Sequence, residues 1–243
     1  MIFDDAAQQP SRPHCDAMTQ IKPMLSLCRL ARLCVLGLAL QTHAANAQTP
    51  GNPAINAQLL VGARQNDLAQ VERVLAQGAA PNSRNRLGKT ALLIAAEKGN
   101  LALATRMLSV GADVNLASLE RVTPLMAASY SGQAALVKLL LDAGAQTALV
   151  DRMNKPAMVY AAAQGNSAAL DVLLGAGIDV DMAHEHRLTA LMWAAGQGHA
   201  DTVRLLMLRG AKAELRDDRD LTALDIARAA GHMAVVALLS AGS

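Results

Sequence analysis

The sequence repeats itself every 33 residues over most of its length, and the register does not slip. Residues 189–211, TALMWAAGQGHADTVRLLMLRGA, contain the two-helix part of one repeat. Thr189 is a good capping residue, and the apolar residues after it predict a short helix that ends near Gly198. Residues 200–209 predict a second short helix that ends at Gly210. One such repeat cannot bury its own apolar face, so the repeats must stack against one another.

The same landmarks recur in five copies. The positions that begin first helices are Thr90, Thr123, Pro156, Thr189 and Thr222. The glycines that end first helices are Gly99, Gly132, Gly165, Gly198 and Gly231, and those that end second helices are Gly78, Gly111, Gly144, Gly177 and Gly210. Glycine suits these ends because it adopts a positive φ without strain. We therefore predict an all-α solenoid of stacked helix-turn-helix repeats.

These motifs resemble the ankyrin-repeat family. Thr123, Pro124 and Leu125, with the alanines that follow, match the T-P-L-H-x-A-A part of its pattern. Residues 111–115, GADVN, match its end. The resemblance covers about residues 54–243 and implies an ankyrin-repeat solenoid of about six repeats, two of them caps. It also implies short hairpin-like loops before the first helices, which we call the first to fifth fingers: residues 84–89, 117–122, 150–155, 181–188 and 214–221.

The resemblance further implies a function and a binding surface. Ankyrin repeats are non-enzymatic protein-interaction scaffolds, and the partner, of unknown identity, would lie in the concave groove of finger tips and first-helix ends. Tyr130 is the aromatic candidate anchor. The residues that match the variable positions of the family are Arg86, Leu87, Lys89, Glu97, Lys98, Leu119, Glu120, Val122, Tyr130, Ser131, Arg152, Met153, Lys155, Gln164, Glu185, His186, Leu188, Gln197, Asp218, Arg219 and Leu221.

Residues 1–47 have the three parts of a signal peptide. Basic residues precede the apolar run at 33–40, and Ala45, Asn46 and Ala47 form an A-x-A cleavage site. The apolar run is too short to span a bilayer, which takes about 20 residues. We therefore expect cleavage after Ala47 and a periplasmic or secreted protein, similar to bacterial exported ankyrin-repeat proteins, with no membrane insertion after cleavage.

The expected start of translation and the domain boundaries follow from the signal-peptide interpretation. Acidic residues precede the basic stretch, which signal peptides avoid, so we expect translation to start at Met18 or Met24. Residues 48–53 are expected to be a flexible lead-in, followed by the repeat domain at 54–243.

Composition excludes several classes of function. Residues 48–243 carry 18 Lys and Arg against 17 Asp and Glu, whereas a nucleic-acid-binding domain is normally strongly basic. All three cysteines, Cys15, Cys28 and Cys34, precede the cleavage site, so the mature chain has no disulfide and no thiolate metal site. No nucleophile elbow, Walker loop or dinucleotide-binding fingerprint is present. We expect no cofactor, no catalytic residue and a monomer.

Histidines supply the alternative function, metal or small-ligand binding at the fourth finger. His184, Glu185 and His186 resemble the start of the H-E-x-x-H zinc motif, but Leu188 replaces its second histidine. His184 and His186 could still meet a metal from one side of an extended finger tip. His199 and His232 follow a helix-ending glycine, where the family usually has a structural histidine.

Other positions carry expectations about packing and turns. Leu140 and Leu173 are predicted to be core residues of second helices, and Trp193 is interpreted as core. Ala57 replaces the capping Thr in the first repeat, and Pro156 removes that cap in the fourth, where Asn154 could replace part of it. The family's turn glycine survives only as Gly88; Arg121, Asn154, Arg187 and Asp220 replace it, so these four turns are expected to depart from ideal geometry.

Charge changes along the fingers. The first finger sums to +3 from Arg84, Arg86 and Lys89, and the second to zero. The third, fourth and fifth fingers sum to +1, −1 and −2, counting Asp151 and Asp217 among them. This predicts a field that is basic at one end of the groove and acidic at the other, which would orient a partner.

Overall fold

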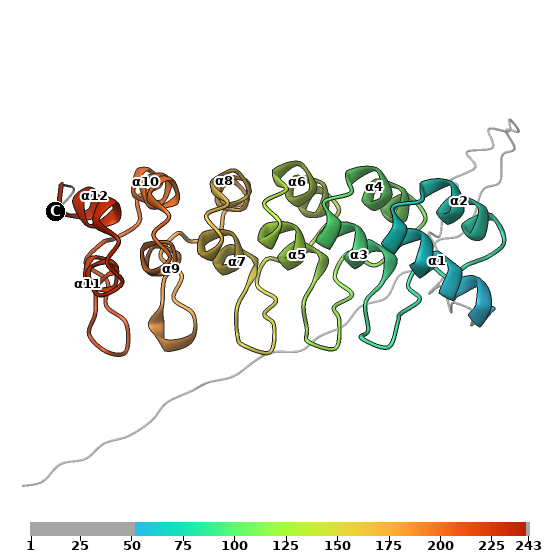
Figure 1. Ribbon diagram of the computed structural model, residues 1–243, viewed down its shortest axis with the longest axis horizontal. Coiled ribbons are helices and arrows are strands. Elements are labelled where there is room, and N and C mark those ends of the chain that lie inside the picture. Colours follow the sequence, from blue (N-terminus) through green and yellow to red (C-terminus); the bar gives the residue numbers. More distant parts are fainter. Residues whose placement is uncertain (1–51, 242–243) are drawn as a thin grey trace, which may run out of the picture. The chain divides into compact units, whose positions relative to one another are not determined.

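The structure is a computed structural model that describes residues 52–241; the predicted signal peptide, its predicted cleavage site and most of the expected lead-in lie outside them. The described residues form helices and loops, and they contain no strand (Figure 1). No helix among residues 52–241 is long and apolar enough to cross a bilayer. The helices are α1 (Pro53–Gln65), α2 (Leu68–Ala76), α3 (Ala91–Lys98), α4 (Leu101–Ser109), α5 (Pro124–Tyr130), α6 (Ala134–Asp142), α7 (Ala157–Ala163), α8 (Ser167–Gly175), α9 (Ala190–Gly196), α10 (Ala200–Leu208), α11 (Ala223–Ala229) and α12 (Met233–Ala241), with a 3₁₀ helix η1 (Glu185–Arg187).

The helices form two layers. Each odd-numbered helix packs against the next odd-numbered helix and against its own even-numbered partner, and α4 to α12 pack successively in the second layer. The fingers extend from the odd-numbered layer, away from the even-numbered helices (Figure 1). This is the solenoid that the period of 33 predicts, and the helices begin and end close to the predicted landmarks.

Side-chain caps explain where most first helices begin. The hydroxyl of Thr90 accepts a hydrogen bond from the N–H of Leu93 (3.1 Å), and Thr123, Thr189 and Thr222 make the equivalent contact. Each contact satisfies one of the backbone N–H groups that a helix leaves unpaired at its start. Pro156 precedes α7 with no side-chain cap, as predicted, and Asn154 does not restore it.

The first repeat differs from the expected register. α1 begins at Pro53, with Asn52 as the cap, and Ala57 therefore lies inside the helix instead of at its start. The Oδ1 atom of Asn52 accepts from the N–H of Ala54 (3.0 Å), and proline at the first helical position needs no N–H partner. The lead-in interpretation of Asn52 and Pro53 was therefore wrong, and α1 has 13 residues where α9 has 7.

The core lies between the two layers and between neighbouring repeats. Leu140 of α6 and Leu173 of α8 are fully buried, which confirms the prediction for both. Alanines fill most of the inner face of the first helices and let the helices approach closely. Truncation of a fully buried leucine to alanine typically costs about 2–5 kcal/mol, so we expect Leu173→Ala to destabilise the stack far more than a change at exposed Arg209.

Polar side chains join each repeat to the one before it. A ring nitrogen of His199 lies 3.0 Å from the carbonyl oxygen of Ala163, and His232 makes the same contact with Gly196 (3.1 Å). Asn166 occupies the equivalent position one repeat earlier and donates to the carbonyl of Tyr130 (2.7 Å). These contacts satisfy carbonyls at the ends of first helices and support the structural role expected for both histidines.

Candidate functional site

All five fingers close with the same backbone turn. In the second finger, Ser118 N–H donates to the carbonyl of Val122 (2.9 Å), and Arg121 N–H donates to the carbonyl of Ser118 (2.9 Å). Arg121 adopts φ 62°, close to the 73° of Gly88 in the first finger. Asn154, Arg187 and Asp220 also adopt positive φ. The expectation that non-glycine residues would distort these turns was therefore wrong for the second, third and fifth fingers, whereas the fourth departs from them, with a second positive φ at His186. The hydrogen-bonded turn outweighs the moderate cost of a left-handed residue.

One side-chain position stabilises these turns, and the sequence reading missed it. It is the residue at the base of each finger: Asn85, Ser118, Asp151, His184 and Asp217. Asn85 Oδ1 accepts from the N–H groups of Leu87 and Lys89 (2.8 and 3.0 Å). Asp151 and Asp217 each accept the same pair of bonds, and Ser118 accepts one. The sequence signal that could have revealed this position is a side-chain oxygen repeated every 33 residues, which asparagine, serine or aspartate supplies.

The fourth finger has histidine at this position and a different tip. His184 offers no oxygen, and its buried Nε2 atom makes no hydrogen bond with residues 52–241. Burial lowers the pKa of His184 below its ordinary value, because the charged imidazolium loses hydration. The tip forms η1, with positive φ at both His186 and Arg187.

The conformation of this tip differs from the extended one that the metal-site hypothesis assumed. It is a 3₁₀ turn and not an extended segment, so His184 and His186 are not alternate residues of a strand. His184 is half-buried, whereas His186 is exposed and lies 3.6 Å from a carboxylate oxygen of Asp218 in the fifth finger. Within residues 52–241, no group of three or more His, Cys, Asp and Glu is placed to hold a metal ion. The geometry therefore gives the metal-binding alternative no support.

The aromatic residues of the described chain gather at one place. The rings of Tyr130 and Tyr160 meet edge to face with centroids 6.0 Å apart. The ammonium of Lys155 lies 4.5 Å from the centre of the Trp193 ring. The four side chains line one hollow of about 250 Å³ between the third finger and α5, α7 and α9. Such a cluster combines a large apolar area with polar tips, which is typical of binding anchors.

The structure changes the interpretation of Trp193 and adds Tyr160 to the candidate site. Trp193 is only half-buried: it packs against the core and also lines the hollow, so its assignment to the core was right only in part. Tyr160, one period before Trp193, was missed. Its hydroxyl donates to Asp151 Oδ2 (2.6 Å), and burial, this hydrogen bond and the Asp151 charge raise the pKa of Tyr160 above its ordinary value. Asp151 therefore connects the base of the third finger to the aromatic cluster.

Two further hollows adjoin this one along the fingers. Lys155 and Trp193 also line a second hollow of about 350 Å³, which the fourth finger closes with His186 and Leu188. His186 and Leu188 also line a third hollow, of about 330 Å³, against the fifth finger. We call the three adjoining hollows the central groove. Of the predicted binding residues, those that line it are Tyr130, Arg152, Met153, Lys155, Gln164, Glu185, His186, Leu188, Gln197, Asp218 and Arg219.

The remaining predicted binding residues lie elsewhere on the finger side. Arg86 and Leu87 line a separate hollow against α1. Lys89 and Glu97 form an ion pair of 2.6 Å. The others do not line these hollows: Lys98, Leu119, Glu120, Val122, Ser131 and Leu221. None of the predicted residues is buried, and Leu87, Leu119, Tyr130 and Met153 are among the most exposed large apolar side chains of residues 52–241.

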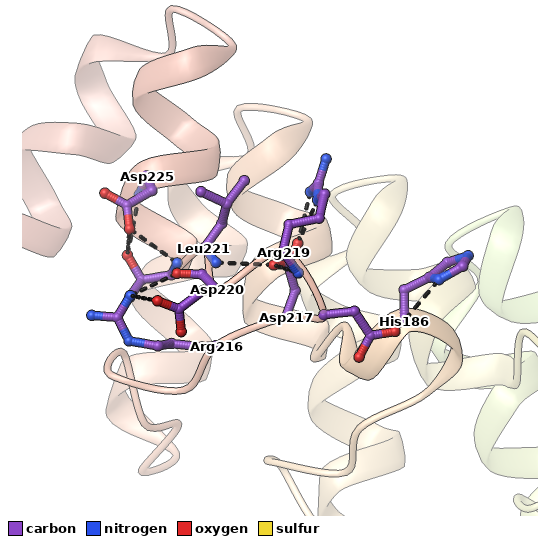
Figure 2. Close-up of polar contacts among 9 residues, drawn as sticks. His186, Arg216, Asp217, Arg219, Asp220, Leu221 and Asp225 are labelled. Atoms are coloured by element: carbon purple, nitrogen blue, oxygen red, sulfur yellow. Dashed lines mark hydrogen bonds and ion pairs between the residues drawn. The ribbon is translucent and has the colours of Figure 1, made fainter.

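Two acidic residues of the fifth finger pair with arginines of the same finger. Asp217 is buried in the fifth finger, where Arg219 pairs with it at 2.7 Å (Figure 2). Burial disfavours its ionisation, but hydrogen bonds from Leu221 N–H and from the Arg219 side chain and N–H, together with the Arg219 charge, hold the pKa of Asp217 below its ordinary value. Arg216 and Asp220 also form an ion pair, at 3.5 Å.

These two pairs leave the fifth finger at −2, because both arginines are already counted in that sum. At the other end of the array, Arg84 and Arg86 have no carboxylate partner among the described residues. The change of charge along the fingers therefore stays a prediction.

Comparison with known proteins agrees with the repeat architecture. A family model described as Ankyrin repeats (3 copies) matches the chain twice, over residues 59–151 and over residues 157–243. The unmatched residues between these segments, 152–156, are the last four residues of the third finger and Pro156, which replaces threonine. No curated protein matches the chain at a significant level.

Proposed function

Because the chain belongs to the ankyrin-repeat family, we propose that it is an exported, non-enzymatic scaffold that binds another protein in the central groove. Ankyrin repeats are generally protein-interaction modules and typically have no catalytic activity. The single observation that carries the proposal is the gathering of Tyr130, Tyr160 and Trp193 around one hollow. They are the only aromatic residues among residues 52–241.

The anchors of this surface would be Tyr130 and Trp193. Tyr130 is 54% exposed, so a partner could cover much of its ring. Trp193 is half-buried and already stacks with Lys155, which keeps it in place before a partner arrives. A rigid aromatic anchor loses little side-chain freedom on binding, which is why such residues dominate the binding energy of many interfaces.

Affinity capture from a periplasmic extract tests the proposal. The Tyr130→Ala, Trp193→Ala double variant should lose proteins that the wild type retains. The matched control is Leu208→Ala, Met233→Ala, which removes two exposed apolar side chains from the other helix layer (78% and 71% exposed). The control should retain the same proteins as the wild type. An identical set of captured proteins for all three chains would contradict the proposal.

Export is a separate part of the proposal, and it is supported by the tripartite pattern of residues 1–47 and by the absence of cysteine after them. Amino-terminal sequencing of protein from the periplasm or medium should begin at Gln48. Recovery of only the uncut chain, and only from the cytoplasm, would refute export without affecting the groove.

A further inference from the structure

A larger hollow, of about 780 Å³, lies between α1 and the first finger. It shares no lining residue with the central groove. One face of α1 forms one wall, with Ala57, Leu60, Val61 and Arg64 at helical spacing. Residues 83–87 form the other wall.

The unusual length of α1 creates this wall. The helix begins at Pro53, five residues before the position at which the repeat pattern would start it, and Pro53 and Asn56 from this extra turn line the hollow. Within the described residues no finger precedes α1.

The charged residues that line the hollow are all basic. Arg64, Arg84 and Arg86 line it, and no Asp or Glu does. Arg84 is fixed, because its guanidinium donates to the carbonyls of Gly88 (3.0 Å) and Ala117. The Arg64 and Arg86 guanidinium groups make no hydrogen bond or ion pair with residues 52–241. The exposed guanidinium groups of Arg64 and Arg86 thus lie beside that of Arg84, whose orientation is fixed by its hydrogen bonds.

The floor of the hollow is apolar. Leu60 is almost fully buried beneath it, while Val61 is 37% and Leu87 61% exposed at its sides. An exposed leucine at a finger tip and an exposed valine on a helix leave apolar area that water does not solvate well. The hollow therefore combines an apolar surface with unpaired guanidinium groups on both walls.

We propose that this arginine-lined hollow binds a segment of the partner protein that carries carboxylates next to apolar side chains. The inference rests on the proposed scaffold function and assigns a partner chemistry to a second surface. Guanidinium groups pair with carboxylates through two parallel hydrogen bonds, and they do so best when no carboxylate of their own protein competes. The apolar side chains of the segment cover Val61 and Leu87, and a basic segment is repelled.

Fluorescence anisotropy with short labelled peptides tests this chemistry on the purified protein. The probe is an extended peptide of alternating Glu and Leu; one comparison peptide has Ser in place of Leu, and another has Lys in place of Glu. The Glu/Leu peptide should bind more tightly than either comparison. Arg64→Glu with Arg86→Glu should weaken its binding about tenfold at about 0.02 M salt and much less at about 0.5 M, because salt screens exposed charges.

The matched control is Arg73→Glu with Arg187→Glu, which changes the net charge equally at exposed arginines outside the hollow. It should bind the Glu/Leu peptide nearly as well as the wild type. Equal weakening by both double variants would overturn the proposal in favour of attraction by net charge alone. Equal binding of the Glu/Ser peptide would overturn the apolar part, and the site would then be one for simple anions.

Failure of this inference can be told from failure of the proposed function. If the arginine variants leave peptide binding unchanged while Tyr130→Ala, Trp193→Ala still abolishes capture, only the arginine-lined hollow is refuted. If capture does not depend on the aromatic pair, the central groove is refuted, whatever the peptides do.

Discussion

The third and fourth fingers are neighbours in the same register, yet they have different tips. In the third, Asp151 accepts hydrogen bonds from Met153 N–H and Lys155 N–H, both at 2.8 Å, and only Asn154 has a positive φ. In the fourth, His184 accepts no such bonds, and the tip tightens into η1 with two residues at positive φ. The helices of the two repeats begin and end at equivalent residues, one period of 33 apart. The difference therefore shows that the helices set the place of a finger, while one side-chain oxygen sets its shape.

The largest effect should come from removing that oxygen. We expect Asp151→Ala to lower the free energy of unfolding by about 2–3 kcal/mol, because two backbone N–H groups and the Tyr160 hydroxyl lose their acceptor. Asp151→Asn keeps one carbonyl oxygen and should cost clearly less. Urea denaturation of both variants measures the difference, and equal losses would mean that the acceptor is not the cause.

The reverse change should repair the fourth finger. His184→Asp introduces an acceptor for the N–H groups of His186 and Leu188 and removes a buried nitrogen without a partner. We expect a gain of about 1 kcal/mol and slower amide exchange at residues 186 and 188. His184→Ala is the control, since it removes the imidazole without adding an oxygen. If aspartate stabilises no more than alanine does, the comparison of the two fingers is wrong.

The second finger offers a smaller test of the same comparison. Ser118 accepts only one bond, from Val122 N–H (3.2 Å), whereas Asn85 accepts two in the first finger. Ser118→Asn should therefore add a bond from Glu120 N–H and raise stability by about 0.5 kcal/mol. Ser118→Ala should lower it, and thermal unfolding of the two variants would show opposite shifts.

The smallest effect concerns pH. Burial lowers the pKa of His184 in the folded state, so the unfolded chain binds its proton more readily. The stability that depends on neutral His184 is complete above the unfolded pKa of about 6.5 and is lost as the pH falls toward the lower folded value. The wild type should therefore lose more stability than His184→Ala between about pH 7 and pH 5. Parallel pH profiles for the two chains would contradict this expectation.

Acid titration of the fifth finger lies outside that window. The pKa of Asp217 is held below its ordinary value, so its contribution to stability is complete above the unfolded pKa, near 4, and is lost only at lower pH. The two effects can therefore be separated along one pH profile, with the histidine effect at the higher pH.

Much of the fold could be predicted because the repeat reports the same local physics many times. Threonine before a first helix and glycine after each helix predicted the helix ends correctly, since caps and positive φ depend on nearby residues. The start of α1 was missed because nothing repeats there. Asn52 and Pro53 begin the helix by their own capping and fixed φ, which resemble turn signals when read alone.

The site was harder to predict because it depends on contacts between repeats. Trp193 and Tyr160 follow the same spacing as buried residues, and only the open side of the stack leaves their rings half-exposed. The turn acceptors Asn85, Ser118 and Asp151 share an oxygen and no residue type, so a pattern of identities does not find them. Counting charges also could not show which of them pair, as Asp217 does with Arg219 in the fifth finger.

The polar contacts that complete the first-helix ends have a direction along the chain. Asn166, His199 and His232 each reach back to a carbonyl of the repeat before them. Each of these first-helix ends is therefore completed by the repeat that follows it. A stack held in this way always has one incomplete edge, on the side toward which the chain runs. An array built this way can lengthen by adding repeats at that edge without any change to those already in place.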